Sequence, residues 1–193
     1  MQKDNGARQL PEGPEGHAEM RYLVTRYPLS SKNDGVILDE DGRRIFRVTN
    51  TTRIEQVGAP LARGIVIADE HAHELAAVWE GHVGQGRAKI YDEDTVVAWV
   101  QRVVPPPPPQ RFHVQFANGE TLVAQGDFAN HHYTIRRGAR NVAQVSEGQT
   151  DGSDLYEVSV GPGMDSELIL ACAAVIDMLA NTTGDLSAGN LPS

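Results

Sequence analysis

A chain of 193 residues with a formal net charge of −9 has the size of one domain with a substantial core. The negative charge argues against a broad nucleic-acid-binding face and against strong attraction to anionic membranes, although it leaves room for a small basic patch. The single cysteine, Cys172, excludes an intramolecular disulfide.

Both ends of the chain are polar. Residues 1–19 are rich in Gly, Pro and Glu and contain no apolar core of the kind found in secretion signals. We predict disordered tails at 1–19 and 182–193, flanking one domain at 20–181. No segment reaches the roughly 20 apolar residues of a transmembrane helix. We therefore expect no integral membrane segment and a cytoplasmic location.

Short strand patterns follow one another through the domain. Asp41-Gly42 and Asn118-Gly119 predict hairpin turns, the first as a two-residue turn in which both positions have positive φ. About twelve strands separated by turn residues are typical of a sandwich or a barrel. The predicted strands are 21–27, 36–39, 45–49, 74–79, 87–91, 95–103, 112–116, 121–127, 133–135, 141–146 and 155–160, with weaker patterns at 53–57 and 64–68.

The last element is predicted to be an apolar helix. Leu168 to Ile176 are nine consecutive apolar residues, and Asp165 is placed to cap the helix. A helix that is apolar on every side must be enclosed, so the strands are predicted to form a closed antiparallel β-barrel around it. Cys172 should behave there as a small hydrophobic residue. The residues predicted to be buried are Leu168, Ile169, Leu170, Cys172, Val175, Ile176 and Leu179.

Four segments resemble the LURP-one-related family: 20–23 (MRYL), 39–46 (DEDGRRIF), 126–135 (GDFANHHYTI) and 173–178 (AAVIDM). The resemblance implies a fold similar to the tubby C-terminal domain and to phospholipid scramblases, a twelve-stranded barrel around a hydrophobic C-terminal helix. Plant members are associated with defence responses, tubby domains bind phosphoinositides through a basic pocket, and scramblases are linked to lipid movement and calcium. No lipid-binding or calcium-binding residue is carried over to this chain.

Basic residues gather near two predicted turns. If these turns lie at the same end of the barrel, their guanidinium groups could hold an anionic lipid headgroup. The acidic residues beside them favour the alternative of scattered surface charge. The candidate anion contacts are Arg43, Arg44, Arg47, Arg136, Arg137 and Arg140.

Histidines and one aspartate form the other polar candidates. His71 and His73 have the spacing of metal ligands, but we expect a solvated hairpin turn there. His131 and His132 should face opposite sides of a strand, and one of them should cap the barrel end through a hydrogen bond. Asp177 either forms a polar site at the barrel mouth or, as we expect, points into solvent.

No motif for a nucleophile, a phosphate loop, a metal or a cofactor is found, and we assign no catalytic, metal or cofactor-binding residue. The five prolines from Pro105 to Pro109 predict a stiff polyproline II connection. The leading hypothesis is a non-enzymatic protein-binding or scaffold module with an unknown protein partner. The alternative is a peripheral sensor of anionic phospholipid, and an enzyme is the third.

Overall fold

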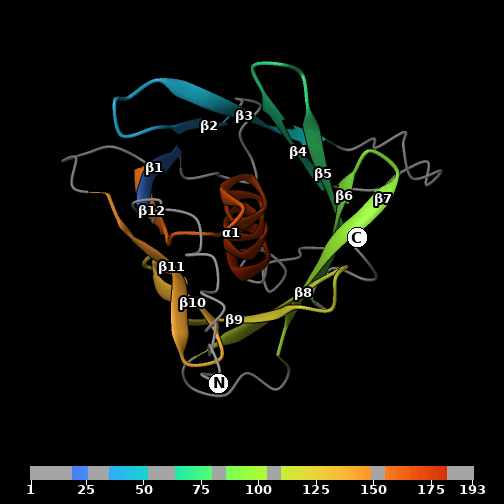
Figure 1. Cartoon of the computed structure of the whole chain (residues 1–193), viewed down its shortest axis with the longest axis vertical. Coiled ribbons are helices and arrows are strands. Elements are labelled where there is room, and N and C mark those ends of the chain that lie inside the picture. Colours follow the sequence, from blue (N-terminus) through green and yellow to red (C-terminus); the bar gives the residue numbers. More distant parts are fainter. Residues whose placement is uncertain are drawn as a thin grey trace, which may run out of the picture.

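A ring of antiparallel strands surrounds one helix (Figure 1). The computed structural model of the chain describes residues 19–25, 35–51, 64–79, 86–103, 110–148 and 155–181. The predicted tails, the pattern at 53–57 and the run from Pro105 to Pro109 lie outside these described residues, apart from Glu19. The predicted fold class, a closed antiparallel barrel around a C-terminal helix, is confirmed.

The described residues form twelve strands and the helix α1 (Ser166–Asn181). From β2 to β12, each strand pairs with the strand that precedes it in the chain. The first strand, β1, also pairs with the last, β12. This pairing closes the barrel and leaves none of the described strands with a free edge. The strands are β1 (Met20–Thr25), β2 (Gly35–Leu38), β3 (Arg44–Thr51), β4 (Gly64–Asp69), β5 (Glu74–Trp79), β6 (Arg87–Asp92), β7 (Thr95–Arg102), β8 (Arg111–Phe116), β9 (Thr121–Asp127), β10 (His132–Arg137), β11 (Arg140–Glu147) and β12 (Leu155–Val160).

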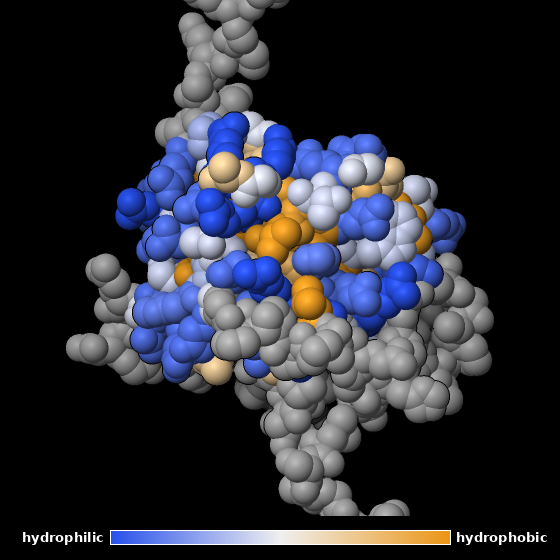
Figure 2. Space-filling view, turned by 90° about the horizontal axis from the view of Figure 1, so that it is seen from below, coloured by the Kyte–Doolittle hydropathy of each residue, from blue (hydrophilic) through white to orange (hydrophobic). Residues whose placement is uncertain are grey.

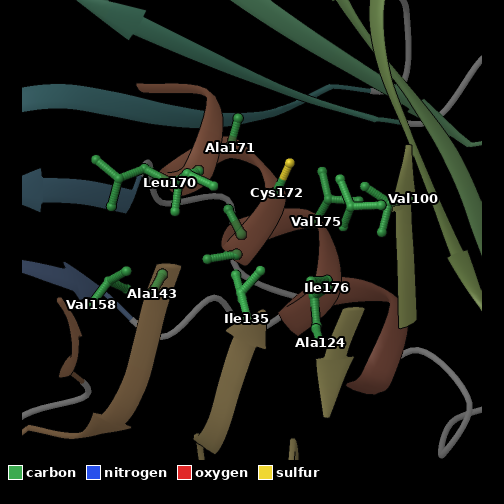
Figure 3. Packing of buried hydrophobic residues seen from close by; sticks show 14 of the residues in the cluster. Val100, Ala124, Ile135, Ala143, Val158, Leu170, Ala171, Cys172, Val175 and Ile176 are labelled. Carbon is green, nitrogen blue, oxygen red and sulfur yellow. The ribbon is translucent and has the colours of Figure 1, made fainter. Parts of the chain in front are cut away.

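The core lies between the inner face of the barrel and α1. Leu170, Cys172, Val175 and Ile176 are enclosed among strand residues such as Val100, Ala124, Ile135, Ala143 and Val158 (Figure 3). Of the helix residues predicted to be buried, all are at most 5% exposed except Leu168, which is partly exposed. Burial raises the pKa of the Cys172 thiol, so this cysteine is an inert core residue.

The barrel has two distinct ends because its strands alternate in direction. The turns after β2, β4, β6, β8 and β10 lie at the end where α1 begins, which we call the entry end. The helix ends at the opposite side, the exit end, beside the β9–β10 turn and the last residue of β7. The face of the barrel seen in Figure 2 is largely hydrophilic, with a narrow strip of hydrophobic side chains in its centre.

Different groups satisfy the two ends of α1, a residue just before the helix at the entry end and a residue of the wall at the exit end. At the entry end, the Leu168 amide donates a hydrogen bond of 3.1 Å to Asp165 Oδ1, the cap predicted from the sequence. At the exit end, Arg102 Nη2 donates to the carbonyl oxygens of Leu179 and Ala180, at 3.1 and 3.2 Å. The last turn of α1 contains no basic residue of its own. The positive charge that interacts favourably with the negative end of the helix dipole therefore comes from Arg102 of β7.

The prediction of a two-residue turn at Asp41-Gly42 is wrong. Asp39 accepts a backbone hydrogen bond from Gly42 and also donates one to the Arg43 carbonyl, which makes a longer hairpin with positive φ only at Gly42. Asp39 Oδ1 also accepts the amides of Asp41 and Arg43, and this side-chain acceptor favours the longer turn. The same pattern recurs from Asp69 to His73, without a glycine.

We predict that Ala72→Gly stabilises the protein. Ala72 has a φ of 64° at the position where the equivalent turn has Gly42 with a φ of 77°. Glycine removes the strain of the left-handed backbone in the folded state, which stabilises the protein, but it also raises the conformational entropy of the unfolded chain, which destabilises it. The first effect is the larger, so the free energy of unfolding should rise by about 0.5–1 kcal/mol. Urea denaturation measures it. Gly42→Ala is the matched control and should lower stability by about 1 kcal/mol; equal stability of all three proteins would contradict the assignment of strain.

Candidate functional site

A hollow with an apolar floor lies at the entry end, where α1 enters the barrel. Its volume is about 350 Å³. The floor consists of Val97, Phe116, Met164, Leu168 and Ile169, and the polar rim of Asn118, Glu120, Arg137 and Asp165. Leu168, in the first turn of α1, is more exposed than the large apolar residues that follow it because it faces this hollow rather than the sealed core. We call this feature the entry hollow.

Arg137 is fixed on the rim of the entry hollow. Its Nη2 forms an ion pair with Glu120 Oε1 and lies 3.1 Å from the Met164 sulfur. The Arg137 side chain is 44% exposed, so the pair contributes little to stability. Its effect is to orient the guanidinium across the mouth of the hollow.

The two groups of candidate arginines share the entry end, but the structure does not bring all six together. The β2–β3 and β10–β11 turns are separated along the wall by β1 and β12. At about 4.8 Å per strand this separation is roughly 19 Å. Arg43 lies 3.5 Å from the Asp41 carboxylate, while Arg136 and Arg140 donate to the carbonyl oxygens of Ala139 and Pro162. Arg44 and Arg47 are exposed on β3.

His73 links three elements at the entry end. The expected β4–β5 turn is present, and in it His73 Nδ1 lies 3.0 Å from Glu167 of α1. Its Nε2 lies 3.0 Å from Asp92 of β6. Hydrogen bonds to Asp92 and to Glu167 raise the pKa of His73, so the charged imidazole ties the helix start to the wall.

The neighbouring histidine does not take part in this bridge. His71 is 80% exposed and lies 3.6 Å from Asp69. In the part of the chain that the structure describes, no group of three or more His, Cys, Asp and Glu side chains is placed to hold a metal ion. The expected turn holds both histidines, but only His71 is largely exposed in it, whereas His73 lies between Glu167 and Asp92.

Asp177 does not point into solvent, and that expectation is wrong. Its carboxylate is 3% exposed and lies 2.7 Å from the Nε2 of His131, whose side chain is 5% exposed. His131 occupies the β9–β10 turn at the exit end with a positive φ of 53°, while His132 is exposed. The turn bends the chain so that the two adjacent histidines have different environments, and His131 is the one that meets the helix end.

Two tyrosines complete this buried polar cluster. The His131 ring stacks on Tyr156 with centroids 4.6 Å apart, and the Tyr133 hydroxyl donates to the Ala173 carbonyl at 3.4 Å. Burial, together with the nearby Asp177 carboxylate, raises the pKa of both tyrosines well above the ordinary value. The cluster is closed to solvent, so it joins the helix to the wall rather than presenting a reactive group.

The β9–β10 turn also explains the glycine in the segment 126–135. Gly126 has a φ of 150°, and a Cβ there would lie 2.4 Å from the His132 carbonyl oxygen. Any side chain at this position would push β10 away from β9. The glycine therefore allows the close approach that places His131 over Asp177.

Comparisons with known proteins agree with this architecture. The sequence model of the family described as LURP-one-related matches residues 20–177. A protein of Arabidopsis thaliana, known from an X-ray structure, superposes with a TM-score of 0.60 at 15% sequence identity. The match covers 85% of this chain and 93% of that one, and at this identity it shows the fold alone. No curated protein sequence matches.

No helix in the described ranges is long and apolar enough to cross a membrane.

We predict that the buried pair at the exit end behaves as one energetic unit. Asp177→Asn removes the charge at constant size, and His131→Asn shortens the side chain while tolerating the positive φ. Each change disrupts the 2.7 Å contact between His131 Nε2 and the buried Asp177 carboxylate, so each should lower the free energy of unfolding by about 3 kcal/mol. Chemical denaturation of both single variants and the double variant measures this. The double variant should lose less than the sum of the two, whereas strict additivity would contradict the coupling.

We also predict a pH-dependent contribution from His73. Because folding raises its pKa above the ordinary 6.5, the stabilisation is fully present below pH 6.5 and is lost as the pH rises through the folded pKa. His73→Gln should therefore be less stable than the native chain at slightly acidic pH, and the difference should shrink toward alkaline pH. Thermal melts from slightly acidic to alkaline pH test this. The exposed His71→Gln is the control and should follow the native profile.

Proposed function

Since this chain belongs to the LURP-one-related family, whose sequence model spans the barrel, we propose that it is a non-enzymatic protein-binding module. In this proposal, the entry hollow receives an apolar side chain from a partner protein. The observation that carries the proposal is the apolar floor of the hollow, surrounded by a polar rim. The cytoplasmic location predicted from the sequence stays a prediction.

The filled interior directs binding to the outside of the barrel. The helix residues at the centre of the barrel are almost completely buried against the strands. A small space between the wall and the exit-end half of α1, beside Asp177 and Tyr156, has a volume of about 10 Å³, which is at the lower limit for one water molecule. This space, between described residues, is too small for a ligand larger than water, so the proposal places the ligand on the surface.

The entry hollow has the character of a pocket for an interface anchor. Protein interfaces concentrate their binding energy in a few buried apolar or aromatic anchors surrounded by polar contacts. Here Phe116 and Leu168 would contact the anchor, and the Arg137–Glu120 pair would contact the polar rim of the partner. The barrel wall and the capped helix start hold these groups in place, so little ordering is needed on binding.

An anionic-lipid sensor is the second candidate, and one observation favours it. Both arginine turns lie at the entry end, so a flat anionic surface could meet both groups at once. The partners of Arg43, Arg136, Arg137 and Arg140 favour the protein-binding proposal, because these guanidinium groups already contact oxygen or sulfur atoms of the chain.

A peptide selection tests the proposed function. We expect a random peptide library displayed on phage, selected on the immobilised full chain, to enrich peptides with a large apolar residue. Met164→Lys places a charge in the hollow and should weaken binding of the enriched synthetic peptide at least about tenfold. Met20→Lys introduces the same charge at a methionine outside the hollow and should leave affinity unchanged.

Other outcomes reject the proposal. Enriched peptides that bind Met164→Lys as well as they bind the native chain would show that the hollow is not the binding site. Co-sedimentation with phosphatidylserine vesicles, lost in Arg43→Glu combined with Arg137→Glu, would instead support the lipid sensor. Vesicles of neutral lipid are the control, and binding should decrease with salt because the contact is electrostatic.

A further inference from the structure

A second hollow lies on the outer wall of the barrel, away from the entry hollow. Its volume is about 300 Å³, and it is formed by side chains from four consecutive strands, β6 to β9. We call it the Trp99 groove. Its lining residues are Arg87, Trp99, Gln101, His113, Gln115 and Thr121.

The strand register sets these side chains in two rows. Gln101 pairs with Arg87 on one side and with His113 on the other, and Gln115 pairs with Trp99 and with Thr121. Neighbours across a strand pair have Cβ atoms about 4.5–5.5 Å apart on the same face. The intervening residues of β7 and β8, such as Val100 and Val114, are fully buried in the core, so both rows face outward.

The Trp99 groove is rich in hydrogen-bond donors. Every polar side chain that lines it can donate a hydrogen bond, and none is a carboxylate, although the chain contains 26 acidic residues. Trp99 is partly buried and adds the only aromatic ring of the lining beside the His113 imidazole. The side chains of Gln101, His113, Gln115 and Thr121 can also accept hydrogen bonds, so the groove is suited to a ligand that offers hydrogen-bond acceptors and flat apolar surfaces, whether or not it carries donors.

A proline-rich peptide has that composition. Proline has a carbonyl acceptor but no backbone N–H, and its ring packs against aromatic side chains. In the polyproline II conformation the carbonyls are unpaired and the peptide is already ordered, so binding costs little conformational entropy. Nucleic acid is disfavoured by the net charge of −9, because its binding depends on the neutralisation of phosphates.

We propose that the Trp99 groove binds a proline-rich segment of another protein in the polyproline II conformation. A proline ring stacks on the Trp99 indole, and the amide groups of Gln101 and Gln115 donate to peptide carbonyls. The site is separate from the entry hollow, and the two proposals stand on different residues. Together they would give a module that contacts two segments of its partners.

Tryptophan fluorescence tests this proposal directly. In the Trp79→Phe background, Trp99 is the single tryptophan of the chain, and decaproline should change its emission in a saturable manner. A decamer of glycine and serine is the control peptide and should have no effect. Calorimetry with Trp99→Ala should show that decaproline binding is lost, while its thermal melt shows that the barrel is folded.

A matched pair of substitutions separates a specific contact from a general charge effect. Gln115→Glu replaces a donor by an acceptor inside the groove at constant shape, and decaproline affinity should fall about tenfold. Gln144→Glu makes the same change at an exposed position of β11 outside the groove and should leave affinity unchanged. Equal affinity for all three proteins would overturn the proposal.

Two further measurements distinguish other occupants. Binding of cellohexaose that depends on Trp99, without binding of decaproline, would identify a saccharide ligand and overturn the proposal. Sedimentation of the chain alone tests self-association. A dimer that depends on Trp99 and is dissociated by decaproline would overturn the assignment to another protein, because Pro105 to Pro109 of a second copy would then be the ligand.

Discussion

The structure depends on the enclosure of one helix. The segment from Leu168 to Ile176 is apolar on every side, so no single packing surface can cover it, and a closed barrel is the simplest sheet that surrounds it. Enclosure creates a second requirement, because the polar groups at both helix ends must find partners in the chain around them. Asp165 and the His73–Glu167 bridge satisfy the entry end, and Arg102 with the His131–Asp177 pair satisfies the exit end.

The sequence predicts the periodic elements well because their cause is local. Alternation along each strand and the unbroken apolar run in the helix are visible within a few residues, and both agree with the structure. The Asp165 cap is local too and is confirmed. The error at Asp41-Gly42 is also instructive, since the Asp39 carboxylate selects a longer turn than the dipeptide alone indicates.

The contacts that reach across the barrel could not be predicted in this way. His131 and Asp177 are far apart in the sequence, and Arg102 meets the helix end only because β7 finishes at the exit end. The negative charge in the last turns of the helix is the one visible signal, because an acidic residue there needs a partner. That signal indicates that a partner exists but not which strand supplies it. The candidate arginines show the same limit, since a shared barrel end does not bring their side chains together.

A barrel whose interior is filled by its own helix has to place its function outside, and the two ends of the helix contribute differently to that function. At the exit end the polar groups are buried with one another and leave a space of only about 10 Å³. At the entry end the chain must pass from β12 into α1, so the wall and the first helical turn cannot close completely, and Leu168 stays partly exposed above Phe116. The entry hollow is thus a consequence of threading the helix into the barrel.

The floor of the entry hollow is continuous with the hydrophobic core, so substitutions there must keep the core packed. The Trp99 groove lies on the outer wall and can change without that constraint. Of the two proposed sites, the entry hollow is therefore the one that core packing constrains, and the Trp99 groove is the one whose lining is set by outward-facing side chains alone.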